Sequence, residues 1–180
     1  NGYKAKQCKQ RNDKAIQHIK EHKFDFVILG ASWPSIATRR IFIEGTRANS
    51  TEVEQEFVNH FTSTIASIVS TGAIPVVINN TPTLGGKSPK CPIKKSLFDD
   101  NLNCSIEKAQ NKLINKVLND LTVKYPQLVS ISLNDLLCND EGCSMSLNNI
   151  PLYRDDDHLN VMGARELSSQ YLLTYKNPFL

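Results

Sequence analysis

Two patterns of hydrophobic residues alternate along the chain: apolar positions at helical spacing, and short continuous apolar runs. Residues 13–22 (DKAIQHIKEH) carry apolar side chains at helical spacing, and residues 24–31 (FDFVILGA) follow as a nearly continuous apolar run. Helical spacing predicts an amphipathic helix, whereas a short apolar run of this length predicts a buried strand. The beginning of the chain therefore predicts a helix that leads into a strand.

The same succession is repeated in the next third of the chain. A second helix is expected to begin at a capping box formed by Thr51 and Glu54 and to end at Gly72. Residues 73–80 (AIPVVINN) then predict a second buried strand. The apolar positions that define this helix are Val53, Phe57, Phe61, Ile65 and Ile68.

A loop rich in Gly, Pro, Lys and Ser is expected over residues 81–103. A third long helix follows it, then a third strand at residues 127–133 (QLVSISL) and a last helix at residues 161–173. The positions that predict these two helices are Ile106, Ala109, Leu113, Val117 and Leu121, and then Leu167 and Tyr171.

Strands that are separated by helices of more than ten residues pair in parallel through right-handed crossovers. The sequence therefore predicts an α/β fold, a three-layer α/β/α sandwich with a parallel sheet, as a single domain over residues 1–180. Functional groups in such sheets lie at the carboxyl ends of the strands. Three segments qualify: residues 30–33 (GASW), residues 79–82 (NNTP) and residues 155–158 (DDDH).

Charge and hydropathy exclude several classes of protein. The net charge is +3, and the 21 basic residues are scattered rather than gathered in a stripe, so nucleic acid is not an expected partner. No run of 18 apolar residues predicts a membrane span, and the polar first residues do not form a signal peptide. If the protein is exported, we expect the export signal to lie outside this chain.

The five cysteines favour an oxidising compartment. Cys91 and Cys104 flank a loop, and Cys138 and Cys143 enclose a short turn, at separations that disulfides can close. We expect two local disulfides and an odd cysteine, Cys8; reduced structural thiols are the alternative. No C-x-x-C pair occurs, so no zinc site is predicted.

Asp155 and His158 form the most specific chemical pattern in the chain. A carboxylate three residues before a histidine can accept a hydrogen bond from the imidazole, orient it and raise its basicity. Such a pair serves a nucleophile. Two alternatives stand beside this interpretation: a solvated acidic loop that covers the last helix, and a divalent cation held by the carboxylates. We predict no metal.

The segment around this pair resembles the SGNH-type domain at the C-terminal end of membrane-bound acyltransferase-3 proteins, which include O-antigen and related glycan O-acetyltransferases. The last block of that family reads approximately Tyr-x-Asp-x-x-His-Leu-Ser-x-x-Gly-Ala, with Asn160 in place of the serine here. Trp33 and the last two cysteines also match, and the resemblance extends from about Cys8 to Leu173. The matching positions of the block are Tyr153, Asp155, His158, Leu159, Gly163 and Ala164.

The resemblance implies an SGNH-hydrolase-like fold with a Ser-His-Asp site. His158 would be the general base and Asp155 its orienting partner, with Asp156 and Asp157 on the solvent side. The Gly-Asp-Ser block that carries the family's serine does not occur in this sequence. We expect it, with the first strand, upstream of Asn1, in a longer protein of which this chain is the C-terminal part; the odd cysteine would then find its partner there.

Ser32 is the alternative nucleophile, because it follows a buried strand and precedes the Asp and His in chain order. In the resemblance it stands in a block that reads Gly-x-Asn-Asp in the family and Gly30, Ala31, Ser32, Trp33 here. Gly30, Ser32 and Trp33 are thus candidates for the oxyanion hole or for substrate contact. Trp33 equally suits core packing. Asn80 is a further candidate for substrate contact, or an ordinary turn residue.

The function implied by the resemblance is O-acyl transfer, most simply O-acetyl transfer, to a bacterial cell-surface polysaccharide. No bound cofactor is implied; the cosubstrate is an acyl donor, ultimately acetyl-CoA, and the partners are a glycan acceptor and a membrane-embedded acyltransferase domain. The expected location is the periplasmic or extracytoplasmic face of the inner membrane. The alternatives are an SGNH esterase that removes acetyl groups, and a non-catalytic module that binds a glycan or a partner protein.

Overall fold

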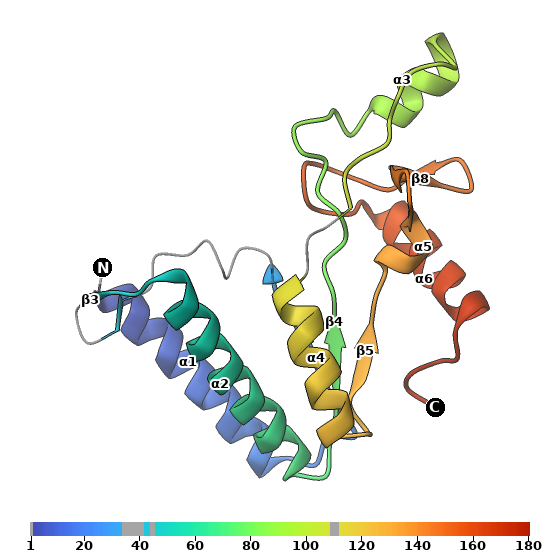
Figure 1. Ribbon diagram of the computed structural model, residues 1–180. Helices are drawn as coiled ribbons and strands as arrows, with labels where there is room; N and C mark the ends of the chain where they lie inside the picture. Colours follow the sequence, from blue (N-terminus) through green and yellow to red (C-terminus); the bar gives the residue numbers. More distant parts are fainter. Residues whose placement is uncertain (1, 34–41, 44–45, 109–111) are drawn as a thin grey trace. The chain divides into compact units, whose positions relative to one another are not determined.

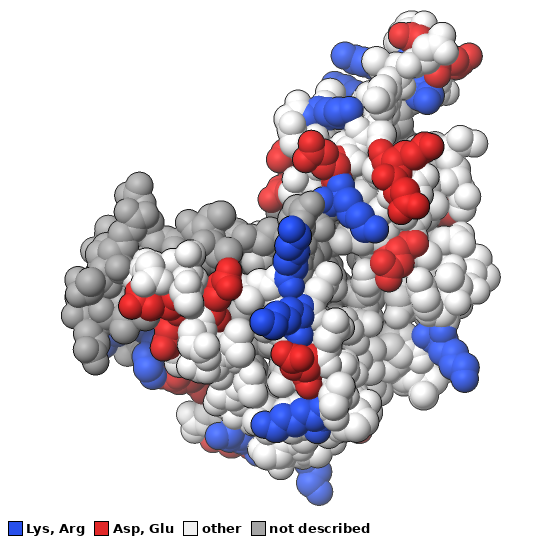
Figure 2. Space-filling view, in the orientation of Figure 1, with Lys and Arg blue, Asp and Glu red and all other residues white. Residues whose placement is uncertain are grey.

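The computed structural model describes residues 2–33, 42–43, 46–108 and 112–180, which divide into two compact units (Figure 1). The first unit contains Asn1–Ile78 and Lys112–Ile131, and the second contains Asn79–Asn111 and Ser132–Leu180. The chain therefore passes from one unit to the other three times. Figure 2 shows basic and acidic side chains interspersed on the face that it draws.

The first unit is built on a parallel sheet of three strands in the order β1-β4-β5. These strands are β1 (Phe26–Gly30), β4 (Ile74–Ile78) and β5 (Val129–Ile131), and each neighbouring pair is parallel. The mixed α/β class and the parallel sheet are thus confirmed. A short antiparallel hairpin, β2 (Phe42–Ile43) and β3 (Thr46–Arg47), follows β1 in the chain.

Three helices belong to this unit: α1 (Gly2–Glu21), α2 (Ser50–Val69) and α4 (Lys112–Lys124). The connection from β1 to β4 contains α2, and the connection from β4 to β5 contains α4, so each parallel pair is joined by a helical crossover. The helix α1 begins earlier than the apolar pattern predicts, because its first half is polar and largely exposed and gives no periodic signal.

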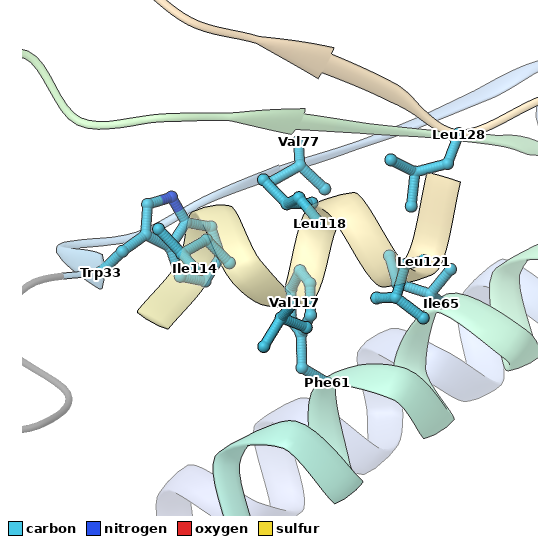
Figure 3. Packing of buried hydrophobic residues seen from close by; sticks show 9 residues of the cluster. All are labelled: Trp33, Phe61, Ile65, Val77, Ile114, Val117, Leu118, Leu121 and Leu128. Carbon is cyan, nitrogen blue, oxygen red and sulfur yellow. The ribbon is translucent and has the colours of Figure 1, made fainter. Parts of the chain in front are cut away.

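The core of the first unit lies between the sheet, α4 and α2 (Figure 3). Leu118 of α4 lies against Val77 of β4, while Val117 faces Phe61 of α2. Full burial of each such side chain contributes about 1.5–3 kcal/mol. The buried residues of this cluster are Trp33, Phe61, Ile65, Val77, Ile114, Val117, Leu118, Leu121 and Leu128.

The start of α2 differs from the predicted capping box. Asn49 is the N-cap: its side chain accepts a hydrogen bond from the backbone N–H of Glu52 at 3.0 Å, and the Glu52 carboxylate accepts the N–H of Asn49 at 2.8 Å. The predicted box of Thr51 and Glu54 is therefore wrong by two residues. An asparagine is as good a cap as a threonine, and its side chain reaches the same N–H group.

The second unit consists of short elements around a separate hydrophobic cluster. They are α3 (Cys91–Phe98), α5 (Asn134–Leu137), β6 (Cys138–Asn139), β7 (Gly142–Cys143), β8 (Ser146–Leu147), β9 (Ile150–Pro151) and α6 (Val161–Thr174). The pairs β6-β7 and β8-β9 are antiparallel hairpins. The buried residues of the cluster are Leu84, Cys91, Ile106, Leu137, Cys143, Met145, Leu152, Tyr153 and Leu167.

Two predictions about this part of the chain are wrong. Residues 81–103 are not loop throughout, because α3 lies within them. Ile106 does not belong to the helix that follows; it forms an isolated antiparallel bridge with Cys143 and is buried in the second unit. Ala109, also predicted for that helix, lies outside the described residues.

Both expected disulfides, Cys91–Cys104 and Cys138–Cys143, are present in the second unit. Cys8 is a free, exposed thiol on α1, where a guanidinium nitrogen of Arg11 lies 3.6 Å from its sulfur. Within the part of the chain that the structure describes, no helix combines the length and the apolar character needed to cross a bilayer.

Candidate functional site

A tight hairpin leads the chain into the predicted site. Asn148 and Asn149 join β8 to β9 with positive φ angles of 47° and 62°. Two successive residues of this kind form the turn whose twist matches that of paired strands, and asparagine adopts it at low cost. The Asn148 side chain also donates to a carboxylate oxygen of Glu166 on α6 at 2.6 Å. The hairpin is thereby attached to the helix that follows the site.

Residues 154–158 form a closed loop between the end of the hairpin and α6. The backbone N–H of Arg154 donates to the carbonyl oxygen of His158 at 2.8 Å, and Tyr153 and Leu159 pair in a short antiparallel bridge just outside it. The loop therefore returns on itself within five residues. This geometry brings Asp155 and His158 face to face.

Asp155 is the hydrogen-bond acceptor at the centre of this loop. Its Oδ1 accepts from Nδ1 of His158 at 2.8 Å and from the backbone N–H of His158 at 2.9 Å. Its Oδ2 accepts from Nε and Nη2 of Arg154 at 3.1 and 3.0 Å. Desolvation raises the pKa of the Asp155 carboxyl, but the hydrogen bonds from His158, from Arg154 and from the N–H of Asp157 outweigh it, and the pKa lies well below its ordinary value.

The ionised state of Asp155 fixes the tautomer of His158. A carboxylate only accepts hydrogen bonds, so Nδ1 of His158 must carry the proton that it shares with Oδ1. The neutral imidazole then has its lone pair at Nε2. Among the described residues none bonds to this nitrogen, and the His158 side chain is 61% exposed. His158 is thus arranged to take a proton from a group that approaches from outside.

Two further charged groups, which the sequence did not predict, contact the Asp155–His158 pair. Asp157, expected only on the solvent side, is exposed but places Oδ1 at 2.9 Å from Nδ1 of His158. Arg154 forms an ion pair with Asp155 at 3.0 Å. Asp157 lies within the D-x-x-H pattern and Arg154 directly precedes it, but the pattern does not by itself say which way either side chain turns.

The loop and the residue that precedes it are attached to residues 82–86 by three hydrogen bonds. The Asp156 carbonyl accepts the N–H of Leu84 at 2.8 Å, and the Asp156 carboxylate accepts the N–H of Gly86 at 3.0 Å. The Tyr153 hydroxyl donates to the carbonyl oxygen of Pro82 at 2.7 Å. Burial raises the pKa of Tyr153, so the phenol stays protonated and keeps its donor role. Asp156, exposed as expected, is therefore also an anchor.

The Asn160 side chain makes three hydrogen bonds at the start of α6. Its Oδ1 accepts the N–H of Gly163 at 2.7 Å and so caps α6. Its Nδ2 donates to the carbonyl oxygens of Pro151 at 2.8 Å and Tyr153 at 3.3 Å. Asn160 thus ties the start of α6 to the segment that precedes the loop.

Asp155, Asp157 and His158 also present one ligand atom each within 4.8 Å of one another, an arrangement that can hold a metal ion. The same three groups are accounted for without an ion, because Nδ1 of His158 is shared between the two carboxylates and Arg154 neutralises part of their charge. A metal bound to Nδ1 would have to displace the proton of the Asp155 hydrogen bond. The donor set therefore fits an oriented imidazole better than a metal centre.

The remaining predicted residues are divided between the two units. Gly30 ends β1 in the first unit, and Ser32 follows it as an exposed residue. Trp33 is buried, donates from Nε1 to the carbonyl oxygen of Ile78 at 2.8 Å, and meets the Phe61 ring edge to face at 5.5 Å. Its ring packs in the core, the simpler of the two expectations. Asn80 follows β4 as a half-buried residue of the second unit.

A polar groove of about 780 Å3 also lies within the second unit. It is lined by residues of α3, α5 and the β6-β7 hairpin and includes both halves of the Cys138–Cys143 disulfide. None of the predicted catalytic or oxyanion residues lines it.

The chain matches the family described as SGNH domain (fused to AT3 domains) over residues 1–172. The chain belongs to this SGNH family. The match confirms the predicted family, and it covers the strand that ends at Gly30, the Asp155–His158 loop and most of α6. Among curated proteins, none matches the sequence.

One solved structure shares the fold of this chain. The periplasmic domain of a lipopolysaccharide acetyltransferase from Salmonella ser. Paratyphi A is 20% identical, with a TM-score of 0.58; the match covers 91% of this chain and 61% of that one. The OSK domain of Drosophila Oskar is 12% identical with a TM-score of 0.40, over 84% of this chain and 62% of that one. The chain thus spans less than two thirds of the length of either.

Proposed function

We propose that this SGNH domain transfers an acyl group, most simply acetyl, to a hydroxyl of a bacterial cell-surface polysaccharide. The observation that carries the proposal is the pair of Asp155 and His158, with Nδ1 of the imidazole on the carboxylate at 2.8 Å and Nε2 open to solvent. The membership in a family fused to AT3 domains supports it, as does the likeness to a lipopolysaccharide acetyltransferase domain.

In the proposed reaction, a serine hydroxyl attacks the carbonyl carbon of the acyl donor while Nε2 of His158 takes its proton. The donor's leaving group departs with that proton, and the serine carries the acyl group as an ester. A glycan hydroxyl then attacks the ester and gives its proton to Nε2, which returns it to the serine oxygen. Asp155 keeps the imidazole in the required tautomer and stabilises its charged form.

The serine has two candidate sources. One is a segment outside these 180 residues, since no Gly-Asp-Ser occurs in the sequence. The other is Ser32, exposed after β1, with Gly30 beside it as a candidate for the oxyanion hole. In either case a membrane-embedded acyltransferase domain would supply the acyl group, originally from acetyl-CoA, and the glycan would be modified on the extracytoplasmic side of the inner membrane.

The proposal is tested by expressing the gene with His158→Ala in its own host and measuring base-released acetate from surface polysaccharide. General-base loss lowers the rate by about 10²- to 10⁴-fold, so O-acetylation should fall to background. Asp155→Asn should lower the rate of acyl transfer by roughly 100-fold or more. His60→Ala is the matched control, because His60 is a solvent-exposed histidine of α2, in the first unit.

Normal O-acetylation in His158→Ala would refute the catalytic proposal and favour a binding module. An increase in O-acetyl content when the gene is deleted would identify a deacetylating esterase instead. Labelling with a fluorophosphonate, followed by peptide mass spectrometry, locates the serine: a label on Ser32 that disappears in His158→Ala would assign it as the nucleophile.

A further inference from the structure

The helix α3 exposes large apolar side chains to solvent. Ile93, Leu97 and Phe98 are 46%, 66% and 82% exposed, whereas Cys91 at the start of the helix is buried. Ile93 and Leu97 are four residues apart and so lie on one face of the helix, whereas Phe98, at the end of the helix, points about 100° further round it. These three side chains give an eight-residue helix a large solvent-exposed apolar surface.

A disulfide and two hydrogen bonds fix the start of this helix. The disulfide Cys91–Cys104 ties its first residue to the returning chain. Lys87 Nζ donates to the carbonyl oxygens of Ser105 at 2.6 Å and Asn103 at 3.4 Å. Pro92, Lys95 and Ser96 of the helix line the polar groove that α5 also lines, whereas Ile93, Leu97 and Phe98 do not. The base of α3 is therefore fixed to the returning chain by a disulfide and by the hydrogen bonds of Lys87.

Lysines accompany the apolar residues of α3. Residues 87–100 contain four lysines and two aspartates, a net charge of +2, and Lys87 is already engaged with backbone oxygens. Lys90 and Lys94 are one turn apart, and helical spacing places them beside the face of Ile93 and Leu97. The aliphatic part of a lysine side chain can cover apolar surface while its charge stays in water. Figure 2 shows side chains of both signs of charge near α3.

We propose that α3 docks into the headgroup region of a bilayer that contains anionic phospholipid. Ile93, Leu97 and Phe98 enter the acyl-chain boundary, and Lys90 and Lys94 lie among the phosphates. Exposed apolar residues interleaved with lysines are the pattern of helices that lie in a membrane interface, and the positive charge complements an anionic surface. The helix is too short to span the bilayer and lies on it.

The test is co-sedimentation of the 180-residue chain with vesicles of phosphatidylglycerol and phosphatidylcholine at 30:70, against phosphatidylcholine alone. We expect binding to the anionic vesicles that weakens as salt rises. Lys90→Gln with Lys94→Gln should weaken binding about fivefold per lysine. Leu97→Ser with Phe98→Ser should weaken it roughly 100-fold. All four side chains are exposed, so these variants should fold.

Matched control variants distinguish a specific effect of α3 on vesicle binding from the effect of removing any exposed lysines or leucines. Leu172→Ser with Leu173→Ser removes two exposed leucines of α6, and Lys112→Gln with Lys116→Gln removes two exposed lysines of α4; both should bind as the unaltered chain does. Absence of binding to anionic vesicles, or equal loss in test and control variants, would overturn the proposal. Concentration-dependent dimerisation that Leu97→Ser with Phe98→Ser abolishes, without vesicle binding, would instead assign the face to a second copy.

Discussion

At the scale of single residues, the site balances two carboxylates against a guanidinium and an imidazole. Arg154 takes one oxygen of Asp155, and His158 takes the other at 2.8 Å. Against desolvation, the hydrogen bonds from His158 and, after them, the one from Arg154 lower the pKa of Asp155, and an ionised Asp155 keeps the proton of His158 on Nδ1. Arg154 is therefore a positioning residue that acts through Asp155.

The dependence of the unfolding free energy on pH below neutrality tests the hydrogen bonds of Asp155. Its pKa is lowered in the folded chain, so the unfolded chain binds more protons as pH falls past the ordinary value of 3.8. The stabilisation by Asp155 is therefore present above about pH 5 and is lost progressively below about pH 4. We expect the free energy of urea unfolding of Asp155→Asn to differ from that of the unaltered chain by a constant amount from pH 7 to 5, and the difference to shrink toward pH 2.5. A difference that does not vary with pH would show that the hydrogen bonds of Asp155 do not form in solution.

The sequence was informative about the pair and silent about its surroundings. Asp155 and His158 are three residues apart, and local geometry alone brings such residues together. The attachment of Asp156 to Gly86 spans 70 residues and uses a backbone N–H, which leaves no mark in a side-chain pattern. Long-range anchors of this kind depend on how two loops meet, and no single-chain periodicity encodes that.

At the scale of elements, the glycine of the last block sets how closely α6 approaches the strand before the loop. A Cβ atom added at Gly163 would overlap the backbone Cα, carbonyl carbon and carbonyl oxygen of Leu152. That carbonyl accepts the N–H of Asn160 at 2.8 Å, so it cannot move without breaking the cap region. The glycine is there for close packing, since its φ angle is not positive.

Gly163→Ala therefore should lower stability although alanine is the better helix former. The gain in helix propensity is at most about 1 kcal/mol, whereas overpacking against a backbone costs about 1–3 kcal/mol or more. We expect a net loss of roughly 2 kcal/mol in urea unfolding. Gly30→Ala is the control, because a Cβ there meets no atom within 4 Å. A stability of Gly163→Ala equal to or above that of the unaltered chain would mean that α6 lies farther from Leu152.

Elements with a long apolar period were predicted well, and short elements were not. The strands at Phe26–Gly30 and Ile74–Ile78 lie within their predicted runs, and α6 ends one residue later than expected. The helix α3 was missed because most of its side chains are exposed and a disulfide, rather than a buried face, holds it. Ile106 fitted a helical period by spacing alone, while its actual partner, Cys143, is distant in sequence.

At the scale of the whole molecule, both disulfides lie in the second unit and the only tryptophan lies in the first. The second unit has few long elements, and its two disulfides cross-link the short ones. The first unit has a sheet and long helices and contains no disulfide among its described residues. The two units thus depend on different sources of stability.

This separation gives a test of whether the chain is one cooperative domain, as predicted. Removing the Cys91–Cys104 bridge with a double Cys→Ser substitution should cost about 3 kcal/mol, the value for a loop of this size. If the units unfold together, the urea midpoint of Trp33 fluorescence should shift even though Trp33 belongs to the other unit. Cys8→Ser, at an exposed thiol, is the control and should leave the midpoint unchanged. An unshifted Trp33 midpoint in the double variant would show independent unfolding.

Because the chain passes between the units three times, neither unit can be encoded by one contiguous segment of the gene. Each unit is assembled from two separate stretches of sequence, interleaved in the order first, second, first, second. No single cut in the gene yields a fragment that encodes one whole unit and nothing of the other. Exchange of a contiguous segment between relatives would therefore replace parts of both units at once, and we expect the two to have diversified as a pair rather than as interchangeable modules.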